Sequence, residues 1–152
     1  MMRFRSMRLL PGGGIVAFAG LLVLLGGQPA HAQNLGQTLD RVAAAWHRGE
    51  AGAITALAAR GGVSVDVDGR SVGPLGQRQA GAVLRRVFED RESVGARANM
   101  NRVVGGNPAR AFGEISWTTR ARGTTIPERA TLFVAFVLED ESWRITEIRL
   151  IR

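Results

Sequence analysis

The chain has 152 residues, of which 20 are basic and 13 acidic, and every basic residue is an arginine. This length suits one domain, and the absence of cysteine excludes disulfides and thiolate chemistry. The arginines are spread along the chain, with Arg85-Arg86 as the only adjacent pair, whereas nucleic-acid-binding proteins concentrate basic residues on one face or arm. The composition therefore argues against a nucleic-acid partner.

Residues 1–32 have the three parts of a secretory signal peptide. Three arginines within the first ten residues precede the apolar run Ile15–Leu25, and Ala30-His31-Ala32 supplies small residues where a signal peptidase cleaves. Cleavage after Ala32 makes Gln33 the first residue of an exported domain, 33–152, which is periplasmic or secreted. The apolar run is short for a bilayer span, so we expect no stable membrane span after cleavage. An uncleaved N-terminal anchor is the alternative.

Apolar spacing predicts two helices at the start of the mature chain. One apolar stripe runs along residues 35–47, and Gly49 ends the helix. A short second helix follows, with its inward face formed by Ala53, Ile54, Leu57 and Ala58. Residues 63–67 then alternate as a half-buried strand, and Asp68-Gly69 predicts a tight turn into a strand stub over 70–72. Gly73-Pro74 is interpreted as loop.

A third helix and two long strands come next. Helical spacing over residues 77–90 predicts the helix, with Arg85 and Arg86 outside its apolar stripe. The following strand is expected to carry Val94, Ala96, Ala98 and Met100 on one face. The strand over 109–119 is expected to carry Ala111, Ile115 and Trp117 on one face and polar residues on the other.

The C-terminal segment predicts the central hairpin of the sheet. Thr131–Leu138 is β-branched and aromatic without charge, which is typical of a strand buried on both faces. Glu139–Ser142 predicts the hairpin loop, and Trp143–Arg152 alternates as a pairing strand. The apolar phase of this last strand shifts by one residue at Thr146-Glu147, which indicates a β-bulge and hence a curved sheet.

The predicted order of elements resembles the nuclear transport factor 2-like superfamily, and within it a small bacterial exported family of unknown function. The matching segments are Ile54–Asp68, Gln77–Phe88 and Trp143–Leu150. The resemblance implies a cone-shaped α+β fold of order ααββαββββ, with N-terminal helices packed on a curved, mostly antiparallel sheet. Relatives include isomerases, dehydratases, ligand carriers and dimerisation modules, so the fold leaves the function open.

Acid–base chemistry has few candidates in the mature chain. His47 is its only histidine and is interpreted as a helix C-terminal residue favoured by the helix dipole. Asp66 and Asp68 flank a tight turn, where carboxylates are typically solvated. No metal site and no cofactor motif is predicted. The alternative is a small hydrolyase or isomerase that uses His47 with one of these aspartates.

The sequence favours a non-catalytic ligand-binding or protein-interaction module. A pocket for an apolar or amphipathic small ligand is expected between the third helix and the sheet, with Arg85 or Arg86 contacting an anionic end. The expected lining is Leu84, Phe88, Trp117, Leu132, Val134 and Phe136. The rival interpretation is a cone that these same side chains fill, with no room for a ligand.

Self-association is the second expectation. Thr131–Leu138 is apolar on both faces, and helices can cover only one of them. An uncovered apolar sheet face marks an interface. We therefore predict a homodimer through the outer face of the sheet.

Overall fold

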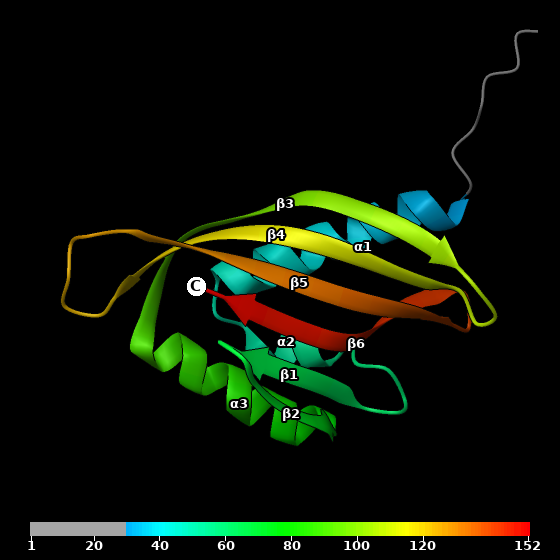
Figure 1. The fold of residues 1–152 in the computed structure, drawn as a ribbon, viewed down its shortest axis with the longest axis horizontal. Coiled ribbons are helices and arrows are strands. Elements are labelled where there is room, and N and C mark those ends of the chain that lie inside the picture. The colour runs from blue at the N-terminus through cyan, green and yellow to red at the C-terminus, as the bar shows by residue number, and fades with distance from the viewer. Residues whose placement is uncertain (1–29) are drawn as a thin grey trace, which may run out of the picture.

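Six strands form one mixed sheet in the order β2-β1-β6-β5-β4-β3 in the computed structural model, which describes residues 30–152 (Figure 1). The parallel pair is β1 with β6, and the other neighbouring strands are antiparallel. The element order is the predicted ααββαββββ, which confirms the α+β class. The strands are β1 (Val63–Val67), β2 (Arg70–Leu75), β3 (Arg91–Gly105), β4 (Arg110–Ala121), β5 (Glu128–Glu139) and β6 (Ser142–Ile151).

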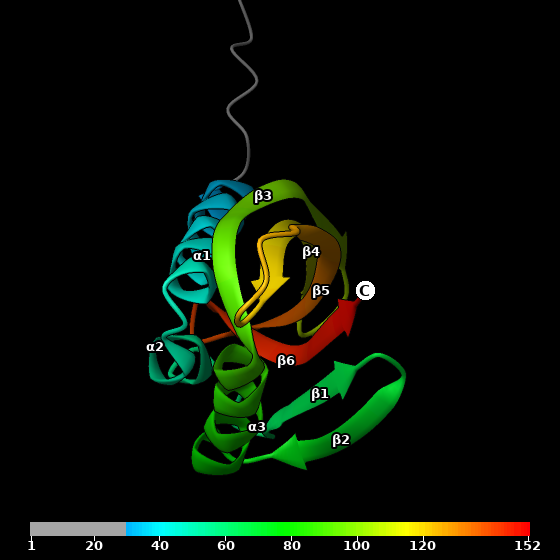
Figure 2. The same ribbon diagram turned by 90° about the vertical axis from the view of Figure 1, so that its left-hand side faces the viewer.

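Three helices cover one side of this sheet. α1 (Ala30–His47) lies along β3 and contacts β4 and β6, while α2 (Ala51–Thr55) packs against α3 (Gln77–Asp90). Figure 2 shows the long strands bending around one side of the domain, with α1 alongside β3 and with α3 beside the β1–β2 hairpin. α3 has the predicted bounds. Most of the predicted signal peptide, residues 1–29, lies outside the described residues.

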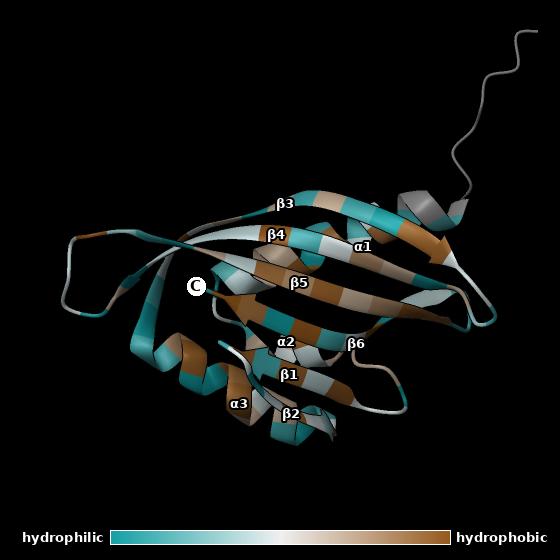
Figure 3. Ribbon diagram, in the orientation of Figure 1, coloured by the Kyte–Doolittle hydropathy of each residue, from teal (hydrophilic) through white to brown (hydrophobic). Residues whose placement is uncertain are grey.

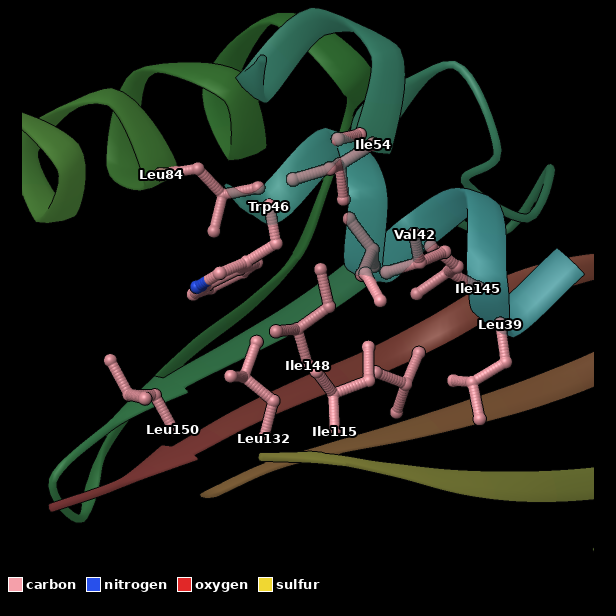
Figure 4. Close-up of a cluster of buried hydrophobic side chains, with 14 of the residues drawn as sticks. Leu39, Val42, Trp46, Ile54, Leu84, Ile115, Leu132, Ile145, Ile148 and Leu150 are labelled. Carbon is pink, nitrogen blue, oxygen red and sulfur yellow. The ribbon is translucent and has the colours of Figure 1, made fainter. Parts of the chain in front are cut away.

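The core lies between the helices and the concave face of the sheet. The α1 stripe Leu35, Leu39, Val42 and Trp46 is buried, as its spacing predicts. Figure 4 shows side chains from α1, α2 and α3 facing side chains from the strands. The fully buried residues of the sheet include Ile115, Leu132, Ile145, Ile148 and Leu150.

The C-terminal hairpin has the predicted pairing and bulge. Figure 3 shows that β5 is apolar along much of its length. Ile145 of β6 pairs with Phe136, whereas Glu147 pairs with the neighbouring Ala135, so Thr146 is the extra residue of a β-bulge. The bulge shifts the side-chain phase by one residue. As a result, apolar residues on both sides of it face the core: Trp143, Ile145, Ile148 and Leu150.

The β1–β2 hairpin is longer than predicted, and α2 is shorter. β2 continues through Gly73-Pro74 to Leu75, where the sequence predicted a loop. An edge strand tolerates proline, because the missing N–H would face away from the sheet. Gly73 has a φ of 134°, and a Cβ there would lie 2.8 Å from the Ser64 Cα. α2 ends at Thr55 and buries Ala51, Ile54 and Thr55. Ala53 lies on the other face of this short helix and is exposed, which corrects its predicted inward orientation.

The face assigned to Met100 is also corrected. β3 changes register between Ala98 and Met100, so Asn99 is an extra residue in the ladder with β4. Ala98 pairs with the buried Ile115, but Met100 pairs with Glu114 on the opposite face. The prediction from the sequence assumed that β3 alternates regularly. The bulge at Asn99 instead moves the side chain of Met100 to the other face of the strand.

Candidate functional site

Five of the predicted pocket residues lie in the packed core. Their side chains are at most 1% exposed and belong to one continuous apolar cluster, in which Phe88 is half-buried. Phe88 and Trp46 contact edge to face, with ring centroids 5.0 Å apart. In this conformation the side chains contact one another across the cone. The five residues are Leu84, Trp117, Leu132, Val134 and Phe136.

Arg85 and Arg86 lie on different sides of α3, and both are exposed. A Cβ placed on Gly81 would lie 3.4 Å from Nη1 of Arg85 and 3.7 Å from Oγ1 of Thr55, so Arg85 lies on the side that faces α2. Arg86 instead lines a groove between α3 and the β1–β2 hairpin. The sequence treated these neighbours as equivalent, and their different surroundings follow from the packing of α3 between two elements.

His47 contacts a residue that the sequence did not single out. Its Nδ1 lies 3.0 Å from Oγ of Ser93, which also accepts the indole N–H of Trp117 at 2.9 Å. Ser93 therefore joins the exposed end of α1 to a buried tryptophan of β4. No local pattern marks Ser93, because the contact depends on where β3 begins relative to α1.

The two candidate aspartates have other partners. Oδ1 of Asp66 accepts the backbone N–H of Gly69 at 2.8 Å, and Asp68 forms an ion pair with Arg152. Both contacts stabilise the β1–β2 turn and its junction with the C-terminus. Within residues 30–152, no group of three or more acidic or histidine side chains is placed to hold a metal ion.

One buried polar atom of the core has no hydrogen-bond partner within the described part of the chain. It is Nε1 of Trp46, a residue that is 1% exposed. The Trp46 ring meets the Trp117 ring edge to face, with centroids 5.6 Å apart. The Phe88 ring also contacts Trp46 edge to face, so two aromatic rings lie against this indole.

The convex side of the sheet presents a continuous surface that no helix of residues 30–152 covers. We call it the outer face. Phe133 is 39% exposed at its centre and stands between Glu114 on β4 and Arg149 on β6. The next row places Phe112 beside Ala135. The outer face comprises Arg97, Met100, Arg102, Phe112, Glu114, Ser116, Thr131, Phe133, Ala135, Val137, Glu147, Arg149 and Ile151.

Charges surround the apolar part of the outer face. Arg149 and Glu147 form an ion pair of 2.6 Å, and Asn99 donates to Glu114 at 3.1 Å. Beyond this surface, Arg120 on β4 forms two hydrogen bonds with Glu92 on β3. The hydrogen bonds, followed by the charge attraction, lower the pKa of Glu92 below its ordinary value and raise the pKa of Arg120.

The element order, the strand order and the bent sheet define a nuclear transport factor 2-like, cystatin-like fold. Solved structures agree. A DUF4783 family protein from Bacteroides ovatus is 17% identical and has a TM-score of 0.59, with 72% of this chain and 90% of that chain covered. A domain of unknown function with a cystatin-like fold from Nostoc punctiforme is 15% identical and has a TM-score of 0.63, with 83% and 79% covered.

A third similar structure is a putative Ca/calmodulin-dependent kinase II association domain from Exiguobacterium sibiricum. It is 14% identical and has a TM-score of 0.59, with 83% of this chain and 96% of that chain covered. No protein-family model and no curated protein matches the chain. At these identities the likeness concerns the fold alone. Among the described helices, none has the length and hydropathy of a bilayer span.

Proposed function

We propose that the mature chain is an exported, non-catalytic interaction module that self-associates through the outer face of its sheet. One observation carries the proposal: Phe133 is 39% exposed on a strand whose other face is fully buried at Leu132 and Val134. An aromatic side chain at the centre of a sheet face is a typical anchor of a protein interface. Phe112, Ala135 and Val137 extend its apolar surroundings.

The distribution of charge on the outer face suits a second copy. A twofold interface brings the same surface together from both partners, so each acidic group needs a basic group on the same surface. Glu114 and Arg149 pair with Phe133 from its two sides, Glu147 pairs with Ala135, and Arg102 pairs with Phe112. Charged groups around an apolar centre are the usual arrangement of an interface rim.

Two observations support a non-catalytic role. His47 contacts Ser93, whereas Asp66 and Asp68 bond within the β1–β2 turn and to Arg152. Acid–base catalysis needs its groups within reach of one substrate, and these residues have separate partners. Turnover of a substrate that is abolished by His47→Ala would contradict this proposal.

Light scattering of the mature protein at about 100 μM, well above a micromolar dissociation constant, tests the self-association. We expect a dimer. Phe133→Glu should give a monomer, because it places a charge at the centre of the interface. Val104→Glu is the matched control, since Val104 is 66% exposed at the end of β3 and should leave the dimer intact. A monomeric wild-type protein at this concentration would refute the proposal.

A ligand within the cone is the second candidate function. The observation that favours it is the unpartnered Nε1 of Trp46, which an acceptor atom of a ligand would satisfy. Such a ligand would have to separate Leu84 from the sheet residues that it packs against. Native mass spectrometry of protein purified from its own host tests this candidate, and a clean unliganded mass would leave only the interaction role.

A further inference from the structure

A groove separates α3 from the β1–β2 hairpin at the edge of the packed core, and it lies apart from the outer face. Its volume is about 660 Å³, which falls within the range of roughly 300–1,000 Å³ that small-molecule sites have. Five valines contribute its apolar surface. They are Val65, Val67, Val72, Val83 and Val87.

The groove arises because α3 has two apolar stripes. Ala80 and Leu84 are fully buried against the core, whereas Val83 and Val87 are only half-buried and line the groove. Residues 83, 86, 87 and 90 follow one another on a single face of the helix. The groove side of α3 therefore presents an apolar centre with Arg86 and Asp90 beside it.

The hairpin supplies the opposite wall. Val65 of β1 pairs with Val72 of β2, and Val67 pairs with Arg70, so each pair lies on one face of the hairpin. This wall includes the buried Val65, but Val72 beside it is 46% exposed. The apolar floor is thus accessible to a solute.

The charges at the rim favour an anion. Arg152 is paired with Asp68, but within residues 30–152 no ion pair forms for Arg70, Arg86 or Asp90. The lining of the groove therefore includes two guanidinium groups and one carboxylate that form no ion pair within the described residues. A guanidinium binds a carboxylate through two parallel hydrogen bonds. Asp90 disfavours a ligand with a second negative charge, so one carboxylate matches the groove.

We propose that this groove is a binding site for a small amphipathic carboxylate, with its apolar tail on the valines and its carboxylate on Arg86 and Arg70. The proposal does not depend on self-association, because the groove residues lie outside the outer face. Binding needs no movement of the core side chains.

Calorimetric titration of the mature protein with decanoate, below its micellar concentration, tests the site. We expect saturable binding of decanoate and much weaker binding of decylammonium, acetate and decyl phosphate. Arg86→Glu should weaken binding by about tenfold or more, as expected for the loss of a charge-assisted hydrogen bond. Arg85→Glu is the matched control, since it makes the same charge change one residue away on the α2 side and should leave the affinity within about twofold.

Three results would overturn the proposal. They are no binding of decanoate at millimolar concentration, equal losses in the two arginine variants, and binding of decylammonium as tight as that of decanoate. If Arg86→Glu fails to fold, methyl NMR of the wild-type protein tests whether decanoate binds in the groove. Decanoate must then shift the methyl signals of Val72, Val83 and Val87 and leave those of the outer-face Val137 unchanged.

Discussion

Trp143 at the start of β6 donates its indole N–H to the backbone carbonyl of His31 in the first turn of α1, at 2.8 Å. The bond joins the last strand of the sheet to the beginning of the described chain. The proposed cleavage site follows Ala32, one residue beyond this carbonyl. Cleavage there removes the acceptor, and the indole N–H of the mature protein is expected to bond water instead.

The first prediction concerns this processing step. We expect the exported protein to begin at Gln33, because the arginine-rich start, the apolar run and the small residues before the site follow the order of a signal peptide. N-terminal mass analysis of protein from the exported fraction measures it. A full-length species retained in the membrane would show that residues 1–32 act as an anchor.

Trp143→Ala should destabilise the domain by roughly 3–5 kcal/mol, the usual cost of removing a buried tryptophan. Trp143 is 3% exposed and belongs to the main apolar core. Chemical denaturation measures the loss. The loss should exceed that for any single charged residue, with Arg120→Gln at a half-buried position as the comparison. An unchanged unfolding midpoint would contradict the buried position of Trp143.

Ser93→Ala should cost about 1–3 kcal/mol, because it leaves the buried indole N–H of Trp117 without an acceptor. His47→Ala removes the other partner of Ser93 but keeps this bond, so its effect should be smaller. Thermal unfolding of both variants gives the comparison. Equal losses would mean that the serine acts mainly through His47.

Gly113→Ala should destabilise the domain by about 1–3 kcal/mol through overpacking. A Cβ at Gly113 would lie 2.6 Å from Cδ2 of Leu39, which is itself 0% exposed and has little room to move. Leu39→Ala removes the obstructing atoms. The double variant should therefore lose less stability than the two single losses added together, and strict additivity would contradict the contact.

Glu92 and Arg120 provide a prediction on pH. The hydrogen bonds from Arg120 lower the pKa of Glu92, so the pair stabilises the fold at pH values above the ordinary glutamate pKa. This contribution is lost as the pH falls through the lowered pKa. NMR titration of the Glu92 carboxyl should show its pKa rising toward the ordinary value in Arg120→Gln. The same pKa in both proteins would exclude the pair as the cause.

The periodicity of the sequence determined the bounds of α3, the order of helices and strands along the chain and the faces of β5 and β6. Each of these depends on whether neighbouring positions are buried, and burial leaves a local pattern of apolar residues. The bulge at Thr146 was predicted for the same reason, because it reverses the apolar phase within a single strand. The face of Met100 was predicted wrongly, because the bulge at Asn99 lies in a strand with few large apolar residues, where no change of apolar phase is visible.

The tertiary structure alone decided which distant residues meet. The contact between His47 and Ser93 joins elements 46 positions apart, and the groove needs α3 and the β1–β2 hairpin to lie side by side. Neighbouring arginines then differ: Arg85 faces α2 and Arg86 faces the groove. Such relations depend on how a curved sheet positions its helices in space. No local pattern in the sequence encodes these contacts between distant elements. Arg85 and Arg86 both occupy exposed helix positions, which an arginine fills equally well whatever lies beside it.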